Sequence, residues 1–377
     1  MGTTIFAEMS ALAAETGAVN LGQGFPDADG PREIAQLAAD AILAGRGNQY
    51  PPGPGIPELR HAIAWHQKRC YGVDYDPGRE ILVTAGATEA VAAALLALVE
   101  PGDEVIALEP YYDSYAACIA MAGGIRVPVT LRPPAFRPDL DALVAAVTPR
   151  TRLILLNTPH NPTGAVLTPA ELAAVAELAC SRDLLVVTDE VYEHLVFEGE
   201  HVPIASLPGM RERTVTISSA GKTFSFTGWK IGWITASADL VAAVKTVKQF
   251  LTFVNGGPFQ YAVAEALRLP DTYFTGLRDD LRRKRDLLSA GLAEVGFEVY
   301  RPAGTYFVTT DIRPFGESDG IAFCRELPRR AGVVAVPLAV LYDNKEAGAS
   351  QVRFAFCKRT EVLEEALTRL RQLTRPG

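Results

Sequence analysis

Between residues 80 and 235 the sequence alternates short apolar runs with longer stretches of helical spacing, and this alternation constrains the fold more than any other feature. Short apolar runs that end in small or turn-forming residues predict buried strands, and the apolar spacing between them predicts helices. The predicted strands are 80–84, 104–108, 125–129, 152–157, 184–188, 214–217 and 231–235. The predicted helices between them are 88–98, 111–122, 139–147 and 169–182, the last opened by the capping pattern Thr168-Pro-Ala-Glu171.

Strands buried on both faces and joined by helices predict an α/β fold with a seven-stranded, mostly parallel or mixed sheet. Helical spacing also occurs before this region, at 31–44 and 57–71. After residue 236 we expect helices and then a smaller α+β domain. The predicted helices that directly follow residue 236 are 239–252, 257–268 and 271–294. Beyond them the predicted strands are 297–310, 332–337 and 351–356, and the predicted helices are 318–329 and 359–373. We expect a large domain at 41–270, a small one at 271–377, and an N-terminal segment, 1–40, that joins the small domain.

Charge and cysteine content narrow the classes of function. The net charge of −8 comes from scattered residues rather than a long basic or acidic run, so we expect no nucleic-acid partner. The five cysteines are odd in number and far apart, which predicts reduced thiols and a cytoplasmic location. The first residues lack a signal-peptide pattern, and no run of 18 apolar residues predicts a membrane span.

Chemically useful residues follow four of the predicted strands, and ligands of such sheets bind at the carboxyl ends of the strands. Lys222 comes just after the strand 214–217 among Ser, Ala and Gly. Desolvation there disfavours the ammonium form and leaves an amine that can bond to an aldehyde. Asp189 and Tyr192 follow the strand 184–188, three residues apart, and Asn161 follows 152–157 between prolines.

The strand 80–84 runs through small residues into a helix, so the N–H groups of Ala87 and Thr88 predict an anion site. An amine, a carboxylate, a phenol, an amide and an anion cradle at one sheet edge are what pyridoxal 5'-phosphate requires. Each signal alone is weak, because an Asp-Glu pair after a strand is more often structural and Asn-Pro-Thr-Gly is also a plain turn. Their combination in chain order predicts a site for this cofactor.

The sequence resembles the class I, fold type I, pyridoxal-phosphate aminotransferases over essentially its whole length. The resemblance rests on Asn161-Pro-Thr-Gly164, Asp189-Glu-Val-Tyr192, Ser218-Ser-Ala-Gly-Lys-Thr-Phe224, Thr227-Gly-Trp-Lys-Ile-Gly-Trp233 and Val352-Arg-Phe354. Within that family, Asn20-Leu-Gly-Gln-Gly-Phe-Pro-Asp27 is similar to the kynurenine aminotransferase / glutamine transaminase branch. Asn48-Gln-Tyr-Pro-Pro-Gly-Pro-Gly55 is similar to bacterial members of that branch, including succinyldiaminopimelate aminotransferases.

The resemblance implies a catalytic role for Lys222, Asp189 and Tyr192. Lys222 would hold the cofactor as an imine and then shuttle the substrate proton, while Asp189 would keep the pyridine nitrogen protonated. Tyr192 and Asn161 would hydrogen-bond the ring oxygen. The remaining cofactor-binding residues would be Ala87, Thr88, Ser219 and Lys230 at the phosphate, Tyr112 stacked on the ring, and Tyr50 from the second subunit of a homodimer.

For the substrate, the resemblance implies that Arg353 pairs with the α-carboxylate and that Gly24, Asn161 and Phe6 lie beside it. Two structural alternatives stay open: Arg353 in an internal salt bridge, and Tyr112 as a core aromatic residue. The resemblance implies transfer of an amino group from an L-amino acid, or from N-succinyldiaminopimelate, to a 2-oxo acid such as 2-oxoglutarate by a ping-pong mechanism. The eukaryotic kynurenine enzymes carry an aromatic residue and a histidine where this chain has Phe253-Val-Asn-Gly-Gly-Pro258, so their preference for aromatic substrates need not apply.

Other functions fit the sequence less well. A metallohydrolase motif fails, because Glu190-Val-Tyr-Glu-His194 has one histidine where H-x-x-E-H has two. We therefore expect no metal site, with His194 and His201 at the surface. Gly86-Ala-Thr-Glu-Ala90 is not the G-x-G-x-x-G of a nicotinamide dehydrogenase, and the chain has no room for the DNA-binding domain of a regulator. A pyridoxal-phosphate β-lyase of the cysteine-conjugate or cystathionine type remains the alternative, since fold alone does not fix the reaction.

Overall fold

A computed structural model describes residues 4–373, and it contains the seven predicted strands in one sheet. The strand order is β2-β8-β7-β6-β5-β3-β4, and only β8 runs antiparallel to its neighbours. The sheet is therefore mostly parallel, as predicted. Its strands are β2 (Ile81–Ala85), β3 (Glu104–Glu109), β4 (Ile125–Thr130), β5 (Thr151–Asn157), β6 (Leu185–Asp189), β7 (Thr214–Ser219) and β8 (Ile231–Thr235).

Helices cover both faces of this sheet, because alternate strand residues face opposite layers. On one face Leu82 and Val105 pack with α4 (Gly86–Leu98), α5 (Asp113–Met121) and α9 (Ala238–Lys248). On the other face Ile81 and Val83 pack with α3 (Pro57–Tyr71) and α10 (Gly257–Ala266), while Ile154 packs with α6 (Leu140–Ala145) and α7 (Pro169–Ser181). The predicted capping box of Thr168 and Glu171 opens α7.

The predicted helix 239–252 ends early. Helix α9 stops at Lys248, because the buried Lys248 ammonium donates to the Phe253 carbonyl and Glu89 accepts the Thr252 N–H and hydroxyl. These bonds turn the chain before it reaches α10.

A second, smaller sheet is antiparallel and has four strands in the order β12-β13-β10-β9. Its strands are β9 (Glu298–Tyr300), β10 (Phe307–Asp311), β12 (Val336–Pro337) and β13 (Gln351–Ala355). The expected single strand at 297–310 is wrong, because Ala303 and Gly304 donate their N–H groups to the Gly164 carbonyl and reverse the chain. The expected strand at 332–337 is likewise divided, into β11 (Val333–Val334) and β12.

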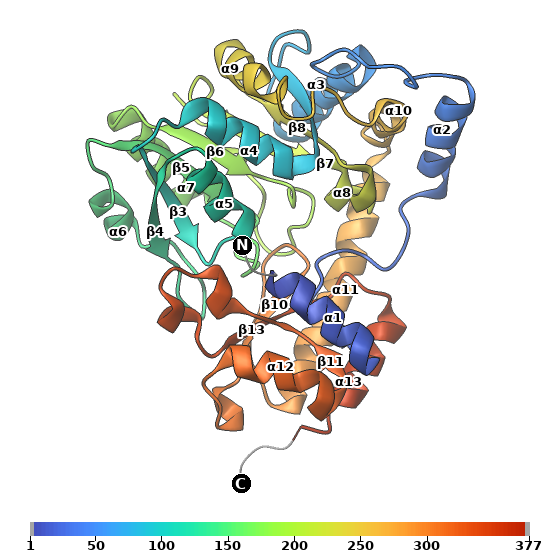
Figure 1. Cartoon of the computed structure of the whole chain (residues 1–377), viewed down its shortest axis with the longest axis vertical. Helices are drawn as coiled ribbons and strands as arrows, with labels where there is room; N and C mark the ends of the chain where they lie inside the picture. The colour runs from blue at the N-terminus through green and yellow to red at the C-terminus, as the bar shows by residue number, and fades with distance from the viewer. Residues whose placement is uncertain (1–3, 374–377) are drawn as a thin grey trace.

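Three helices surround the smaller sheet: α11 (Asp271–Val295), α12 (Gly320–Ala331) and α13 (Thr360–Leu370). In Figure 1, α11 runs from the upper body, near α10, into the lower body that holds β10 and β13. The helix is 25 residues long, so it links the two sheets with a single continuous element.

The N-terminal segment lies against the end of the chain. Helix α1 (Ile5–Thr16) is drawn in blue among the orange and red elements of Figure 1. Strand β1 (Val19–Asn20) pairs in parallel with β11. Helix α2 (Arg32–Leu43) instead packs through Ile34 and Ala38 on the cluster that includes α3 and α10. The division at residues 40 and 270 stays a prediction, and a boundary after residue 40 would cut α2.

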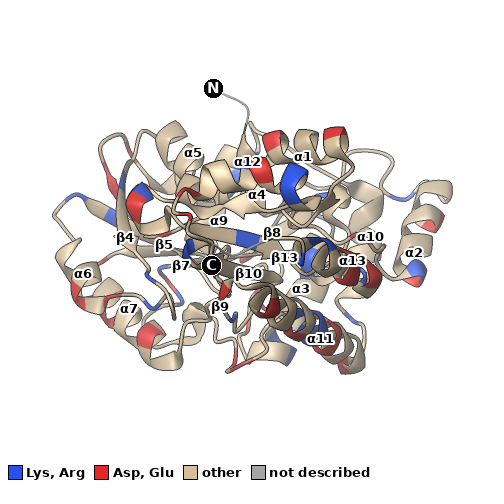
Figure 2. Ribbon diagram, turned by 90° about the horizontal axis from the view of Figure 1, so that it is seen from below, with Lys and Arg blue, Asp and Glu red and all other residues tan. Residues whose placement is uncertain are grey.

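Acidic and basic residues are mixed over the outer helices, including α11, rather than gathered by sign (Figure 2). Within residues 4–373, no helix combines the length and apolar composition that crossing a bilayer requires. All five cysteines are unpaired.

Candidate active site

A cavity of ≈ 500 Å³ opens at the carboxyl ends of the parallel strands, between the large sheet, the N-terminal segment and β13. It brings together residues that are far apart in sequence. Of the predicted site residues, all except Tyr50 line it: Phe6, Gly24, Ala87, Thr88, Tyr112, Asn161, Asp189, Tyr192, Ser219, Lys222, Lys230 and Arg353.

Lys222 lies in α8 (Ala220–Thr223), the single helical turn that follows β7. Its Nζ is 3.4 Å from the Gly24 carbonyl oxygen and lies 5.8 Å and 5.6 Å from the ring centres of Tyr192 and Tyr306. Burial lowers the pKa of Lys222, and the nearby Arg353 and Lys230 charges act in the same direction. The neutral, nucleophilic amine is therefore easier to reach than in an exposed lysine.

Asp189 ends β6 and is 6% exposed. Its Oδ2 accepts a 2.6 Å hydrogen bond from Tyr115 Oη, and its Oδ1 accepts one from the Val191 N–H at 3.3 Å. Burial raises the pKa of Asp189, while Tyr115, Val191 and the Lys222 charge oppose that rise. These donors fix the carboxylate at the cavity wall, where it can accept a hydrogen bond from a protonated ring nitrogen and stabilise its positive charge.

Arg353 lies on β13 and is 2% exposed. Its Nη1 donates to Asn161 Oδ1 at 3.0 Å, its Nη2 donates to the Gly22 carbonyl at 2.9 Å, and its guanidinium carbon lies 4.0 Å from the ring centre of Phe307. Burial lowers the pKa of Arg353 to about 10.

No carboxylate within the described residues pairs with Arg353, and its buried Nε has no hydrogen-bond partner there. The internal salt bridge considered from the sequence is therefore absent from this part of the chain. A buried guanidinium without an anion is costly, so the arrangement favours an anionic ligand.

The Asn161 side chain is oriented by its neighbours. Asn157 Oδ1 accepts the Asn161 N–H at 2.7 Å, and Asn157 Nδ2 donates to the Asp189 carbonyl at the same distance. Because Arg353 engages Asn161 Oδ1, the Nδ2 group is left to face other partners as a donor.

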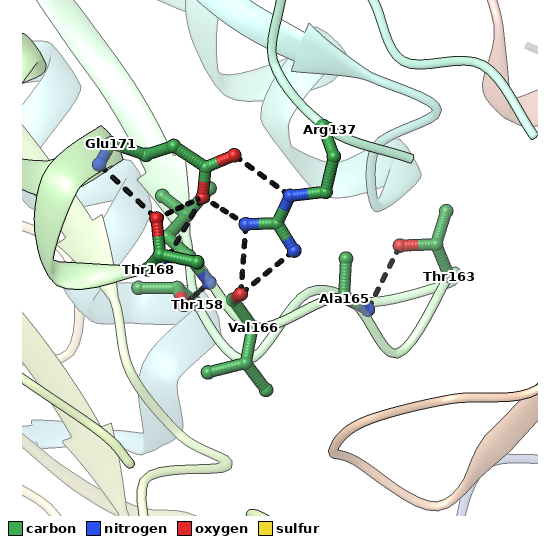
Figure 3. A network of polar contacts seen from close by, with 8 residues as sticks. Arg137, Thr158, Thr163, Ala165, Val166, Thr168 and Glu171 are labelled. Carbon is green, nitrogen blue, oxygen red and sulfur yellow. Dashed lines mark hydrogen bonds and ion pairs between the residues drawn. The ribbon is translucent and has the colours of Figure 1, made fainter. Parts of the chain in front are cut away.

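A clamp outside the cavity holds the loop that carries Asn161 (Figure 3). Arg137 donates from Nε to Glu171 Oε1 at 2.7 Å, and its two terminal nitrogens donate to the Val166 carbonyl at 3.0 Å and 2.9 Å. Thr158 Oγ1 accepts the Leu167 N–H at 3.1 Å. The start of α7 and the loop 158–167 are therefore tied together through one guanidinium.

At the other end of the cavity, helix α4 begins without a side-chain cap. The ammonium of Lys230 lies beside this start, since a Cβ built on Gly86 would be 3.3 Å from Lys230 Nζ. Lys230 itself has a left-handed backbone, with φ of 54°. Free N–H groups and one cation at the same place form a site for a phosphate-sized anion.

Tyr50 does not line the cavity. It is 83% exposed, and its ring packs edge-on against Phe253 with 5.6 Å between centroids. Tyr112 lines the cavity rather than the core, and its ring meets Tyr115 edge-on at 5.9 Å.

Sequence reasoning missed several residues of the site. Tyr115 bonds to Asp189, and Asn157 bonds to Asn161. Tyr115 lies in the predicted helix 111–122, and Asn157 ends the predicted strand 152–157. Tyr306, whose hydroxyl donates to the Gly24 carbonyl at 2.5 Å, and Phe307 follow the chain reversal that the sequence did not reveal.

The expectation that His194 and His201 are surface residues is wrong. The His201 side chain is 3% exposed and its Nε2 lies 2.8 Å from Glu190 Oε2, because a buried carboxylate needs a donor. His194 is partly buried, and its Nε2 lies 2.9 Å from His66 Nε2. Burial lowers the pKa of His194 to about 3 and that of His66 to about 4, so both rings are neutral near pH 7.

Comparison with known families finds one that spans nearly the whole chain. The family model described as aminotransferase class I and II matches residues 16–370. The chain is 56% identical to a probable N-succinyldiaminopimelate aminotransferase of Mycobacterium tuberculosis, over 98% of this chain and 95% of that protein. The solved structure of the M. tuberculosis N-succinyldiaminopimelate aminotransferase has a TM-score of 0.97 and covers 99% of this chain and 98% of that one.

Two further relatives bear different activities in their names. The chain is 44% identical to the methionine aminotransferase of Escherichia coli, over 99% of this chain and 96% of that protein. It is 37% identical to human kynurenine–oxoglutarate transaminase 1, over 97% of this chain and 94% of that protein.

Proposed function

The chain belongs to the class I and II aminotransferases, with the fold type I architecture of that family, and we propose that it is a pyridoxal 5'-phosphate enzyme acting through Lys222. It is an aminotransferase of the branch that includes N-succinyldiaminopimelate and kynurenine aminotransferases. The observation that carries the cofactor proposal is the convergence of Lys222, Asp189 and the uncapped start of α4 on one cavity.

The donors present fit this cofactor. Lys222 would hold it covalently, Asp189 would face the ring nitrogen, and the start of α4 with Ser219 and Lys230 would bind the phosphate. Tyr112 would lie against the ring, while Tyr192 and Asn161 would donate to the ring oxygen. When bound, pyridoxal phosphate supplies an electron-withdrawing ring that stabilises negative charge at the substrate Cα.

The protein's own groups would then orient the substrate and move the proton. Arg353 would bind the substrate α-carboxylate, with its otherwise unpartnered Nε available as a further donor. Gly24 keeps its backbone close to this place, since a Cβ there would lie 2.5 Å from the Phe307 ring. Lys222 Nζ, whose pKa burial lowers, would take the proton from the substrate Cα and return it.

We propose N-succinyldiaminopimelate as the amino donor and 2-oxoglutarate as the acceptor in a ping-pong cycle. This assignment is supported by the M. tuberculosis relative, which is 56% identical over nearly its full length. A second candidate is a neutral amino acid such as methionine. The half-buried acid Asp113 lines the cavity and would repel a carboxylate at the far end of a substrate.

A donor screen distinguishes these substrates. The enzyme is assayed with 2-oxoglutarate and N-succinyldiaminopimelate, methionine, kynurenine or glutamine, and glutamate formation gives kcat/KM for each. The highest value is expected for N-succinyldiaminopimelate; a methionine value tenfold higher would replace it with the second candidate.

The covalent role of Lys222 has its own test. Borohydride reduction of the holoenzyme followed by peptide mapping should label Lys222, and a label on another lysine would overturn the assignment. Incubation with an amino acid and no oxo acid should stop after one half-turnover, whereas continued release of ammonia and pyruvate would indicate the β-lyase.

We propose a homodimer in the cytoplasm, with Tyr50 reaching the phosphate of the other subunit. Exposed apolar side chains in the segments 43–50 and 250–253 support this assembly. Leu43, Tyr50 and Phe250 are 85%, 83% and 81% exposed, Leu251 and Phe253 are about half exposed, and the Tyr50 ring packs on that of Phe253. Exposed apolar surface is typical of an interface.

A further inference from the structure

A cluster of metal-ligating side chains lies where α3 meets the segment after β6, apart from the cavity described above. His66 comes from α3, and Glu193 and His194 follow Asp189 in the chain. Their ligand atoms all lie within 4.8 Å of one another, and the two Nε2 atoms are 2.9 Å apart. His66 and Glu193 are 1% and 5% exposed, while His194 is partly exposed.

The buried carboxylate of Glu193 lacks a cationic partner in the described part of the chain. Its Oε1 accepts from Ser218 Oγ at 2.5 Å, but no Lys, Arg or His nitrogen of residues 4–373 lies within 4.0 Å of its carboxylate. A buried carboxylate without a cation is unfavourable. A bond between the two imidazoles satisfies the histidines, yet it provides no positive charge for Glu193.

The buried Tyr71 hydroxyl lies beside the Glu193 carboxylate, and burial together with that carboxylate raises the pKa of Tyr71. The Tyr71 ring stacks on His194, with 6.4 Å between centroids. The nearby cationic side chains have acidic partners of their own: Arg69 pairs with Asp271, and His201 Nε2 lies 2.8 Å from Glu190 Oε2.

We propose that His66, His194 and Glu193 bind one divalent transition-metal ion of the zinc class, with two imidazole nitrogens and one carboxylate oxygen as ligands. Zinc prefers this ligand set and a tetrahedral geometry with bonds of about 2.0–2.1 Å to nitrogen. Such bonds separate two ligand nitrogens by about 3.3 Å, so a shift of about 0.4 Å from the present 2.9 Å spacing suffices. A water molecule would complete the shell.

The ion would join α3 to the segment that follows Asp189 and Tyr192, so its role is structural. Amino-group transfer does not require it, and the site is independent of the cofactor and substrate proposed above. Binding to the folded chain alone would raise thermal stability by mass action.

Zinc titration of the chelator-treated holoenzyme tests the site. The purified protein is dialysed against EDTA, then titrated with ZnSO4 by calorimetry in a phosphate-free buffer. One ion per chain is expected, with affinity at least tenfold weaker in His66→Asn and His194→Asn. His61→Asn is the matched control, because His61 is exposed on the same helix and bonds only to its own turn. Zinc should raise the melting temperature of the wild type and of the control, but not of the two variants.

Cobalt substitution tests the wild type without relying on variants that fold poorly. Co²⁺ bound to two imidazoles, a carboxylate and water should give the intense visible bands of four-coordinate cobalt. Equal zinc affinity in wild type, His66→Asn and His194→Asn, or a weak six-coordinate cobalt spectrum, would overturn the proposal and leave only an imidazole–imidazole hydrogen bond.

Discussion

At the scale of single residues, the main feature of the site is that its charged side chains are buried. A buried charge needs a partner of opposite charge or a hydrogen-bonding group. Arg353 is the clearest case, because the described part of the chain gives it two neutral oxygens and a stacked ring but no carboxylate. The substrate would provide the missing anion. Asp189 shows the opposite arrangement, since it is buried with its donors already in place.

Arg353→Lys should raise KM for amino and oxo acids by about 10- to 100-fold, because a hydrogen bond to a charged group contributes roughly 1.5–3 kcal/mol and lysine cannot bind in the same bidentate way. Steady-state kinetics measures the change. Arg359→Lys, an exposed position whose Nε lies 3.7 Å from Asp27, should leave KM unaltered. An unchanged KM in Arg353→Lys would remove Arg353 from substrate binding.

Tyr115→Phe should shift the pH profile rather than only lower the rate. The Tyr115 hydroxyl opposes the burial that raises the pKa of Asp189, so its loss raises that pKa further. Asp189 then takes up a proton at higher pH, and the acidic limb of the kcat/KM profile should move to higher pH. A uniform loss of rate with an unmoved acidic limb would contradict this link.

At the scale of elements, Arg137 determines how the start of α7 and the Asn161 loop hold together. Burial alone would raise the pKa of Glu171. The hydrogen bonds from Arg137 and Thr168 outweigh burial and hold that pKa below the usual value of 4.5. A carboxylate with a depressed pKa stabilises the fold above its unfolded pKa, and this contribution is lost as pH falls through the folded pKa.

Arg137→Met should therefore lower the free energy of unfolding by about 1–2 kcal/mol at pH 7, because it leaves the Val166 carbonyl and Glu171 without their shared donor. The deficit should shrink as pH falls from about 4.5, the ordinary pKa of a glutamate, through the lower pKa of folded Glu171. Urea denaturation at pH 7 and below about pH 4.5 measures the free energy of unfolding of both proteins. Arg182→Met at the opposite end of α7 should have little effect, and an Arg137→Met deficit that is the same at both pH values would exclude the ion pair as its cause.

The large sheet could be predicted because most of its strands are short runs rich in apolar and β-branched residues that are buried on both faces. The edge strand β4 is the more exposed one. The smaller sheet was harder. Its strand β12 is two residues long, as is β11, which pairs with β1 outside that sheet. The reversal between β9 and β10 depends on the Gly164 carbonyl, which is distant in sequence. The strand propensity of residues 297–310 gives no indication of a hydrogen-bond partner so distant in the chain.

The site residues that the sequence predicted are also those with a local signal, and the missed ones depend on partners distant in the chain. Lys222, Asp189 and Asn161 follow strands directly, so strand position reveals them. The pairing of His66 with His194 joins residues 128 positions apart, and no spacing rule in the sequence indicates it.

At the scale of the whole molecule, Phe250→Asp should convert the proposed dimer into a monomer, because a charge would be buried in the proposed interface. Light scattering coupled to gel filtration measures the mass. Met121→Asp, at another exposed apolar residue, is the control. Tyr50→Phe should keep the dimer but weaken retention of the cofactor; a dimer that survives Phe250→Asp would place the interface elsewhere.

The bond between Arg353 and Gly22 spans 331 residues and sets an order of events during synthesis of the chain. A ribosome finishes the seven-stranded sheet long before it releases β13, so the nascent protein can form its anion cradle while it still lacks the guanidinium. Until β11 and β13 have been synthesised, Leu21 and Gly22 lack the partners that Val334 and Arg353 give them in the folded protein.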